Sequence, residues 1–143
     1  MLHTDKLDVI EVVNKLFVFT DSRSWDKIQS EVFAEDVYFD MSSLGGEISM
    51  MTSKQICELW NEGFKRIDSV NHLAGNYIVN INNDKAVVFA YATATHYKES
   101  ASNGKTREFV GTYDIELILL DNGWRINKFK YNLKFMTGNQ TLT

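Results

Sequence analysis

The chain has 143 residues, of which 44% are hydrophobic and 24% charged, and its formal net charge is −4. This length suits one domain over residues 1–143, and the hydrophobic content excludes an intrinsically disordered chain. Because no Lys/Arg run or basic stripe occurs, we expect neither nucleic acid nor a membrane surface as a partner. The first residues contain acids and no long apolar run, which predicts a cytoplasmic protein without a signal peptide.

Helices are predicted for the N-terminal half. Apolar positions over residues 5–20 suit a helix that is buried over most of its circumference. After a turn at residues 21–24, a short second helix begins near Trp25, and residues 37–41 form a strand. Thr52-Ser53-Lys54-Gln55 is a capping box and predicts the start of a third, amphipathic helix.

The C-terminal half is rich in strand-forming residues. Four long runs are separated by good hairpin turns, and they cover His72–Ile81, Lys85–Lys98, Arg107–Leu120 and Trp124–Phe135. Three helices followed by an antiparallel meander, with one earlier strand, predict the α+β class. Strands this long must bend, so we expect a strongly curved antiparallel sheet that wraps the first helix as a cone with a hollow end.

Asp21 is a candidate functional residue at the end of the first helix. Val13, Phe17 and Asp21 are spaced i, i+4 and i+8, so they share the inward face if the helix continues for one more turn. A carboxylate at a helix C-terminus opposes the helix dipole, which favours a cationic group opposite it. The alternative is an aspartate that only forms the turn.

Two histidines lie on the predicted strands. Alternation places His72 on one face with Asn76, and it places His96 at the end of a face made largely of alanines. A row of alanines leaves volume for the floor of a pocket, although it also lets a helix pack closely. Either histidine can equally be a structural residue.

Asp114 and Glu116 lie two residues apart, so both point to the same face of their strand. Burying two carboxylates is costly unless they are paired or protonated, and the alternative is a locally solvated face. The chain has one cysteine, Cys57, and neither a P-loop, a dinucleotide fingerprint nor a metal-binding spacing. We therefore expect no disulfide, metal or cofactor.

Several segments together resemble a known family. Residues 19–26 resemble the acid, charged turn and Trp-Asp signature of SnoaL-like and scytalone dehydratase-like proteins, and residues 72–76 resemble their histidine–glycine strand. Residues 94–97, 111–114 and 121–125 follow in the order of that group. The resemblance covers residues 5–139 and implies a cystatin-like cone of the nuclear transport factor 2-like superfamily, with a pocket at its mouth.

The resemblance also implies roles for single residues. Asp21 and His72 match the acid–histidine pair of scytalone dehydratase and lindane dehydrochlorinase, and His96 matches a second pocket histidine. In this chemistry a histidine takes a proton from a carbon beside a carbonyl, while the carboxylate fixes its tautomer. The dehydratase's tyrosines and its later polar pair are replaced here, so we expect a different substrate. The predicted ligand contacts are Thr20, Met41, Asn76, Asp114, Glu116, Trp60 and Phe17.

The leading interpretation is a dehydratase-type, cofactor-independent lyase or isomerase that acts on a small hydrophobic carbonyl compound. Such a compound is a polyketide-like, steroid-like or aromatic metabolite. The alternatives are a non-catalytic domain that binds a small molecule or a protein, and a β-type accessory subunit of an oxygenase. Long exposed strands predict a homo-oligomer, either a dimer or a trimer.

Overall fold

The computed structural model describes residues 3–143. The helices are α1 (His3–Asp21), α2 (Trp25–Glu31) and α3 (Ser53–Gly63), with a short 3-10 turn, η1 (Ser42–Leu44). The strands are β1 (Phe33–Asp40), β2 (Ile48–Thr52), β3 (Ser69–Asn82), β4 (Lys85–Tyr97), β5 (Thr106–Leu120) and β6 (Gly123–Gly138). They form one sheet in the order β2-β1-β6-β5-β4-β3. This confirms the predicted α+β cone.

The sheet differs from the prediction in two respects. It is mixed rather than antiparallel, because β1 pairs in parallel with β6. It also contains β2, which the sequence analysis did not predict and which pairs with β1. Moreover, β1 begins at Phe33 instead of Val37, since Phe33 already pairs with Ile126 of β6. The β1–β2 hairpin thereby extends the sheet of β3 to β6 at its β6 edge.

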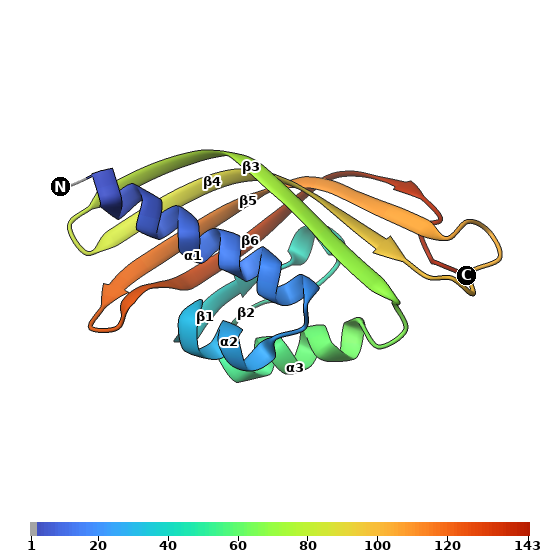
Figure 1. The fold of residues 1–143 in the computed structure, drawn as a ribbon, viewed down its shortest axis with the longest axis horizontal. Coiled ribbons are helices and arrows are strands. Elements are labelled where there is room, and N and C mark those ends of the chain that lie inside the picture. The colour runs from blue at the N-terminus through green and yellow to red at the C-terminus, as the bar shows by residue number, and fades with distance from the viewer. Residues whose placement is uncertain (1–2) are drawn as a thin grey trace.

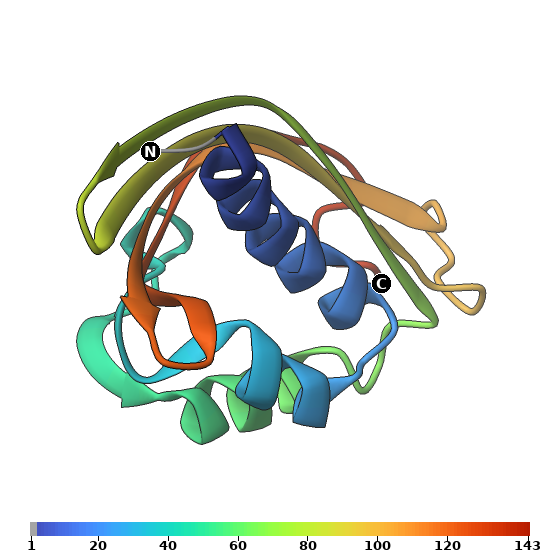
Figure 2. The same cartoon turned by 60° about the vertical axis from the view of Figure 1, so that its left-hand side comes forward.

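The sheet curves around α1. Figure 1 shows α1 running across the concave side of the long strands. In Figure 2 the strands arch over α1, while α2 and α3 lie on the open side of the arch. The capping box of α3 is present, since Gln55 N–H donates to Thr52 Oγ1 (3.1 Å) and the Thr52 backbone N–H donates to Gln55 Oε1 (2.9 Å). None of the helices within residues 3–143 has both the length and the apolarity needed to cross a membrane.

Aliphatic side chains of α1 and the sheet pack together in the core of the cone. Val9, Val13 and Leu16 recur on the inner face of α1 and are almost completely buried. They belong to one core cluster with buried residues of the sheet, among them Val88, Ile115, Leu117 and Ile126. Burial of each such side chain stabilises the fold by about 1.5–3 kcal/mol relative to its exposure to water.

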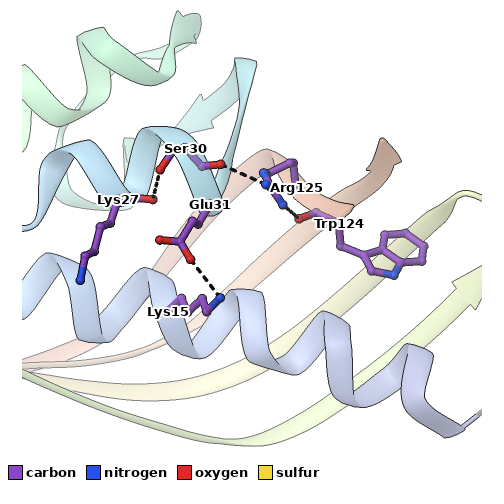
Figure 3. A network of polar contacts seen from close by, with 6 residues as sticks. All are labelled: Lys15, Lys27, Ser30, Glu31, Trp124 and Arg125. Carbon is purple, nitrogen blue, oxygen red and sulfur yellow. Dashed lines mark hydrogen bonds and ion pairs between the residues drawn. The ribbon is translucent and has the colours of Figure 1, made fainter. Parts of the chain in front are cut away.

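Polar contacts fix α2 between α1 and the start of β6 (Figure 3). The Arg125 guanidinium donates to the carbonyl oxygens of Ser30 (3.0 Å) and Trp124 (2.8 Å). Lys15 Nζ of α1 lies 3.2 Å from Glu31 Oε1 at the end of α2. Because Arg125 is buried, its bonds to backbone carbonyls compensate for its desolvation.

A bulge interrupts the alternation of β3. Asn76 has a φ of +53°, and the pairing with β4 shifts between Gly75 and Ile78. His72 is therefore on the inner face before the bulge, whereas Val79 is on the inner face after it and Asn76 is exposed. The prediction that His72 and Asn76 share a face is wrong, because a bulge inserts one residue and reverses the direction of those that follow.

Candidate functional site

A cavity of about 180 Å³ lies between α1, α3 and the concave side of the sheet. Nine apolar residues line it: Leu16, Phe17, Met41, Leu44, Trp60, Phe64, Ala94, Phe109 and Phe129. The five polar residues in its wall are Thr20, His72, His96, Tyr113 and Tyr131. Apolar walls with a few polar groups are typical of sites for small organic ligands, where the polar groups set the orientation.

Small side chains on β4 help to keep this volume open. The inner face of the strand is formed by Ala86, Val88, Ala90, Ala92, Ala94 and His96, as the alternation predicts. Ala92 belongs to the core cluster, and Ala94 lines the cavity. Since a methyl group reaches only a short distance above the sheet, the alanines leave the space beside His96 unfilled.

Asp21, the last residue of α1, is in direct contact with His72 near the start of β3. Its Oδ1 lies 2.6 Å from His72 Nδ1, and its Oδ2 accepts the His72 backbone N–H at 2.8 Å. The His72 side chain is 10% exposed and that of Asp21 21%. A carboxylate can only accept, so Nδ1 carries a proton and Nε2 is the nitrogen that can take or release one.

The turn after α1 holds Asp21 against β3. Arg23 adopts the left-handed region with a φ of +56°, and its Nη2 donates to the Ile67 carbonyl at 2.5 Å. Ile67 lies just before β3, so this bond ties both ends of the Asp21–His72 contact together. Phe17, one turn earlier on α1, packs against the His72 ring with a centroid distance of 5.4 Å.

His96 has the opposite kind of partner. It pairs across the β4–β5 ladder with Arg107, whose Nε donates to His96 Nδ1 at 3.1 Å. A guanidinium has no acceptor, so His96 Nδ1 must offer its lone pair, and the ring proton is then on Nε2. Burial, followed by the charges of Arg107 and His72, lowers the pKa of His96 to about 3. His96 is therefore a neutral hydrogen-bond donor at neutral pH.

The two histidines thus present different groups from one wall of the cavity. His72 can offer the lone pair of Nε2, whereas His96 offers an Nε2–H. A cation on His72 further disfavours a cation on His96. Among the described side chains of residues 5–143, no three His, Cys, Asp or Glu residues gather as a metal site would require.

A family model described as a SnoaL-like domain matches residues 3–130. The chain belongs to the SnoaL-like family. No curated protein matches its sequence. This SnoaL-like domain is similar in structure to a protein from Kribbella flavida, with a TM-score of 0.91, 22% identity and coverage of 97% of this chain and 96% of that one.

Two further solved structures share the fold of the SnoaL-like domain. A proposed scytalone dehydratase from Novosphingobium aromaticivorans has a TM-score of 0.81 and 12% identity, with 94% of this chain and 87% of that chain covered. A hexachlorocyclohexane dehydrochlorinase from Novosphingobium barchaimii has a TM-score of 0.79 and 13% identity, with 94% and 90% covered. At these identities the likeness establishes the architecture.

Four of the predicted ligand contacts line the cavity of the SnoaL-like domain. They are Phe17, Thr20, Met41 and Trp60. Thr20 Oγ1 donates to the Leu16 carbonyl at 2.6 Å, so its proton is used within α1 and its oxygen can still accept. Met41 and Trp60 also line a wider groove outside the cavity, which marks this side as its mouth.

Three other predicted contacts do not reach the cavity. Asn76 is exposed because of the bulge in β3. Asp114 accepts from Asn132 Nδ2 (2.8 Å), and Glu116 lies 3.1 Å from Lys128 Nζ, both across β5–β6. The inner face of β5 carries Tyr113, Ile115 and Leu117 instead, so alternation directs both acids outward. The solvated face is thus the correct interpretation of this carboxylate pair.

Sequence reasoning missed three polar residues of the site, Arg107, Tyr113 and Tyr131. Arg107 could be found only from the register that pairs it with His96. Tyr131 follows Phe129 on the inner face of β6, and its hydroxyl is buried without a hydrogen-bond partner among the described residues. Alternation along the predicted strand places Phe129 and Tyr131 on one face, but it cannot show that the hydroxyl lacks a partner.

Proposed function

We propose that this SnoaL-like domain is a cofactor-independent lyase or isomerase that acts on a small hydrophobic carbonyl compound. The observation that carries the proposal is the pair of histidines with opposite proton positions in one apolar cavity. In this mechanism His72 Nε2 takes a proton from the carbon beside the carbonyl. His96 Nε2–H donates to the carbonyl oxygen as negative charge develops there.

Asp21 supports the proton transfer in two ways. Its contact with Nδ1 keeps the Nε2 lone pair available, and its charge stabilises the imidazolium that forms. The electron pair of the broken C–H bond moves into the carbonyl, which gives an enolate. The enolate then either expels a leaving group from the neighbouring carbon, as in a lyase, or takes a proton back at another carbon, as in an isomerase.

The fold neighbours support the lyase branch of this proposal. One is described as a scytalone dehydratase and another is a hexachlorocyclohexane dehydrochlorinase, and both names denote eliminations. The aromatic walls favour a flat ring as the body of the ligand, because Phe17, Trp60 and Phe109 all face the cavity.

The direct test is exchange of the protons beside the carbonyl of 1-tetralone, followed by proton NMR in deuterated water. We expect the protein to accelerate the exchange, and we expect His72→Ala to lower the accelerated rate by roughly 10²–10⁴-fold, the usual contribution of a general base. Leu73→Ala is the matched control, since Leu73 is the next residue but is 75% exposed. It should leave the rate unchanged.

Full activity in a folded His72→Ala protein would refute the assignment of the base. Saturable binding of 1-tetralone without any exchange would favour the alternative, a non-catalytic domain that binds small molecules. Circular dichroism and thermal unfolding of each variant show whether the fold is retained.

A further inference from the structure

The Tyr131 hydroxyl has no role in the mechanism above. Tyr131 lies on the inner face of β6, lines the cavity and is 4% exposed. Among the described residues, its hydroxyl oxygen is buried and has no hydrogen-bond partner. Buried hydroxyls in native proteins nearly always have a partner, because leaving one unpaired costs free energy. A phenylalanine would fill the same space without this cost.

Gly111 on the neighbouring strand makes room for this hydroxyl. A Cβ at position 111 would lie 2.5 Å from the Tyr131 hydroxyl oxygen and would also overlap the Asn132 carbonyl. Any other residue would therefore displace the ring. Gly111 pairs with Ala92 on β4, so the hydroxyl lies above a part of the sheet that carries only small side chains.

The hydroxyl is a donor, and it lies farther along the β4–β5 ladder than His96, above the Gly111–Ala92 pair. Burial raises the pKa of Tyr131 to about 12, so the phenol keeps its proton. Tyr131 pairs with Tyr113 of β5, and His96 pairs with Arg107, six residues earlier on the same strand. The Tyr113 and Tyr131 rings are 4.8 Å apart, so two phenol side chains lie next to each other in this part of the cavity wall.

We propose that Tyr131 is a specificity-determining residue whose hydroxyl donates to a second oxygen of the ligand, at the end away from the carbonyl. The ligand is then a flat, hydrophobic carbonyl compound with a hydroxyl, ether or further carbonyl oxygen at its far end. The inference rests on the proposed function only in assigning the carbonyl to the histidine end. The contact with Tyr131 itself requires no turnover.

A pair of bicyclic ketones tests the contact by isothermal titration calorimetry. 6-Hydroxy-1-tetralone carries an oxygen at the far end of the ring system, and 1-tetralone lacks it. We expect the protein to bind the hydroxy ketone about tenfold more tightly, the effect of one well-placed hydrogen bond. Tyr131→Phe should abolish this preference while the affinity for 1-tetralone stays the same. Tyr91→Phe is the control, since Tyr91 is 41% exposed on the outer side of β4.

Thermal unfolding separates a ligand contact from a structural role. Because the hydroxyl is unpaired, Tyr131→Phe should unfold at the same or a higher temperature than the parent protein. A lower unfolding temperature would show that the hydroxyl stabilises the fold, and it would overturn the inference. So would equal binding of the two ketones, binding of neither, or a preference that survives in Tyr131→Phe.

The outcomes distinguish this inference from the proposed function. Loss of the preference in Tyr131→Phe without any proton exchange in the parent protein would support the binding role and refute the enzyme. Exchange that depends on His72, combined with an unchanged preference in Tyr131→Phe, would support the enzyme and refute the binding role of Tyr131.

Discussion

His72 on β3 and His96 on β4 lie on neighbouring strands, line the same cavity and are about equally buried. Their partners differ in charge, since His72 meets the Asp21 carboxylate and His96 meets the Arg107 guanidinium. The carboxylate accepts from Nδ1 of His72 and leaves its Nε2 lone pair available, whereas the guanidinium donates to Nδ1 of His96 and leaves the ring proton on Nε2. The partner on Nδ1 therefore decides which nitrogen of each ring carries the proton, while burial contributes most to keeping His96 neutral.

Of the changes considered, removing the charge of Asp21 should have the largest effect, and it should act on the rate of proton exchange. In Asp21→Asn, the amide NH₂ faces either Nδ1, which moves the ring proton to Nε2, or the His72 backbone N–H, which breaks that hydrogen bond. We expect the exchange of 1-tetralone to slow by roughly 10³–10⁴-fold, as when the aspartate of a catalytic triad is replaced.

Asp114→Asn is the matched control for this experiment. Asp114 points to the outer face of β5 and bonds Asn132, so its replacement should change the rate by less than about twofold. Equal losses in Asp21→Asn and Asp114→Asn would contradict the placement of the base.

A smaller effect is expected on the free energy of unfolding, which should depend on pH because of His96. The folded pKa of about 3 lies below the 6.5 of an ordinary imidazole, so the unfolded chain takes up this proton first as the pH falls. The stabilisation is complete above pH 6.5 and is lost toward pH 3. Between pH 6.5 and 5 we expect the free energy of unfolding to fall by about 1.5 kcal/mol from this group.

Urea unfolding at several pH values measures this loss. His96→Asn is the suitable variant, because its Oδ1 can still accept from Arg107 while nothing at position 96 titrates. Its stability curve should be flatter by about the same 1.5 kcal/mol over that interval. A variant curve with the slope of the parent protein would show that His96 binds its proton equally well in the folded and the unfolded chain, which contradicts the lowered pKa.

Much of the site could be predicted because local rules hold where it is built. Helical spacing predicted that Asp21 faces inward, where it meets His72, and alternation predicted that His96 shares a face with the alanines of β4. The family resemblance joined Asp21 to His72 across 51 positions, which no local pattern could do. In the structure Asp21 Oδ1 and His72 Nδ1 are in contact.

The remaining features depend on register and backbone geometry, which local patterns do not determine. The predicted runs Lys85–Lys98 and Arg107–Leu120 do not determine the register between the two strands, and the structure pairs His96 with Arg107. Alternation also assumes an unbroken pleat, and the left-handed Asn76 breaks it. Arg107, which sets the tautomer of His96, was missed because the register was unknown. Asn76 was misplaced because the bulge could not be foreseen.

The most direct test of the account is the position of the protons on the two rings, which long-range ¹H–¹⁵N NMR spectra of the imidazoles report. His72→Ala and His96→Asn assign the signals. We expect His96 to be neutral with its proton on Nε2 at pH 7, and His72 to carry a proton on Nδ1. Arg107→Met should relax the preference of His96 without altering His72. A proton on Nδ1 of His96 in the parent protein would contradict the account, because both rings would then offer the same group to the ligand.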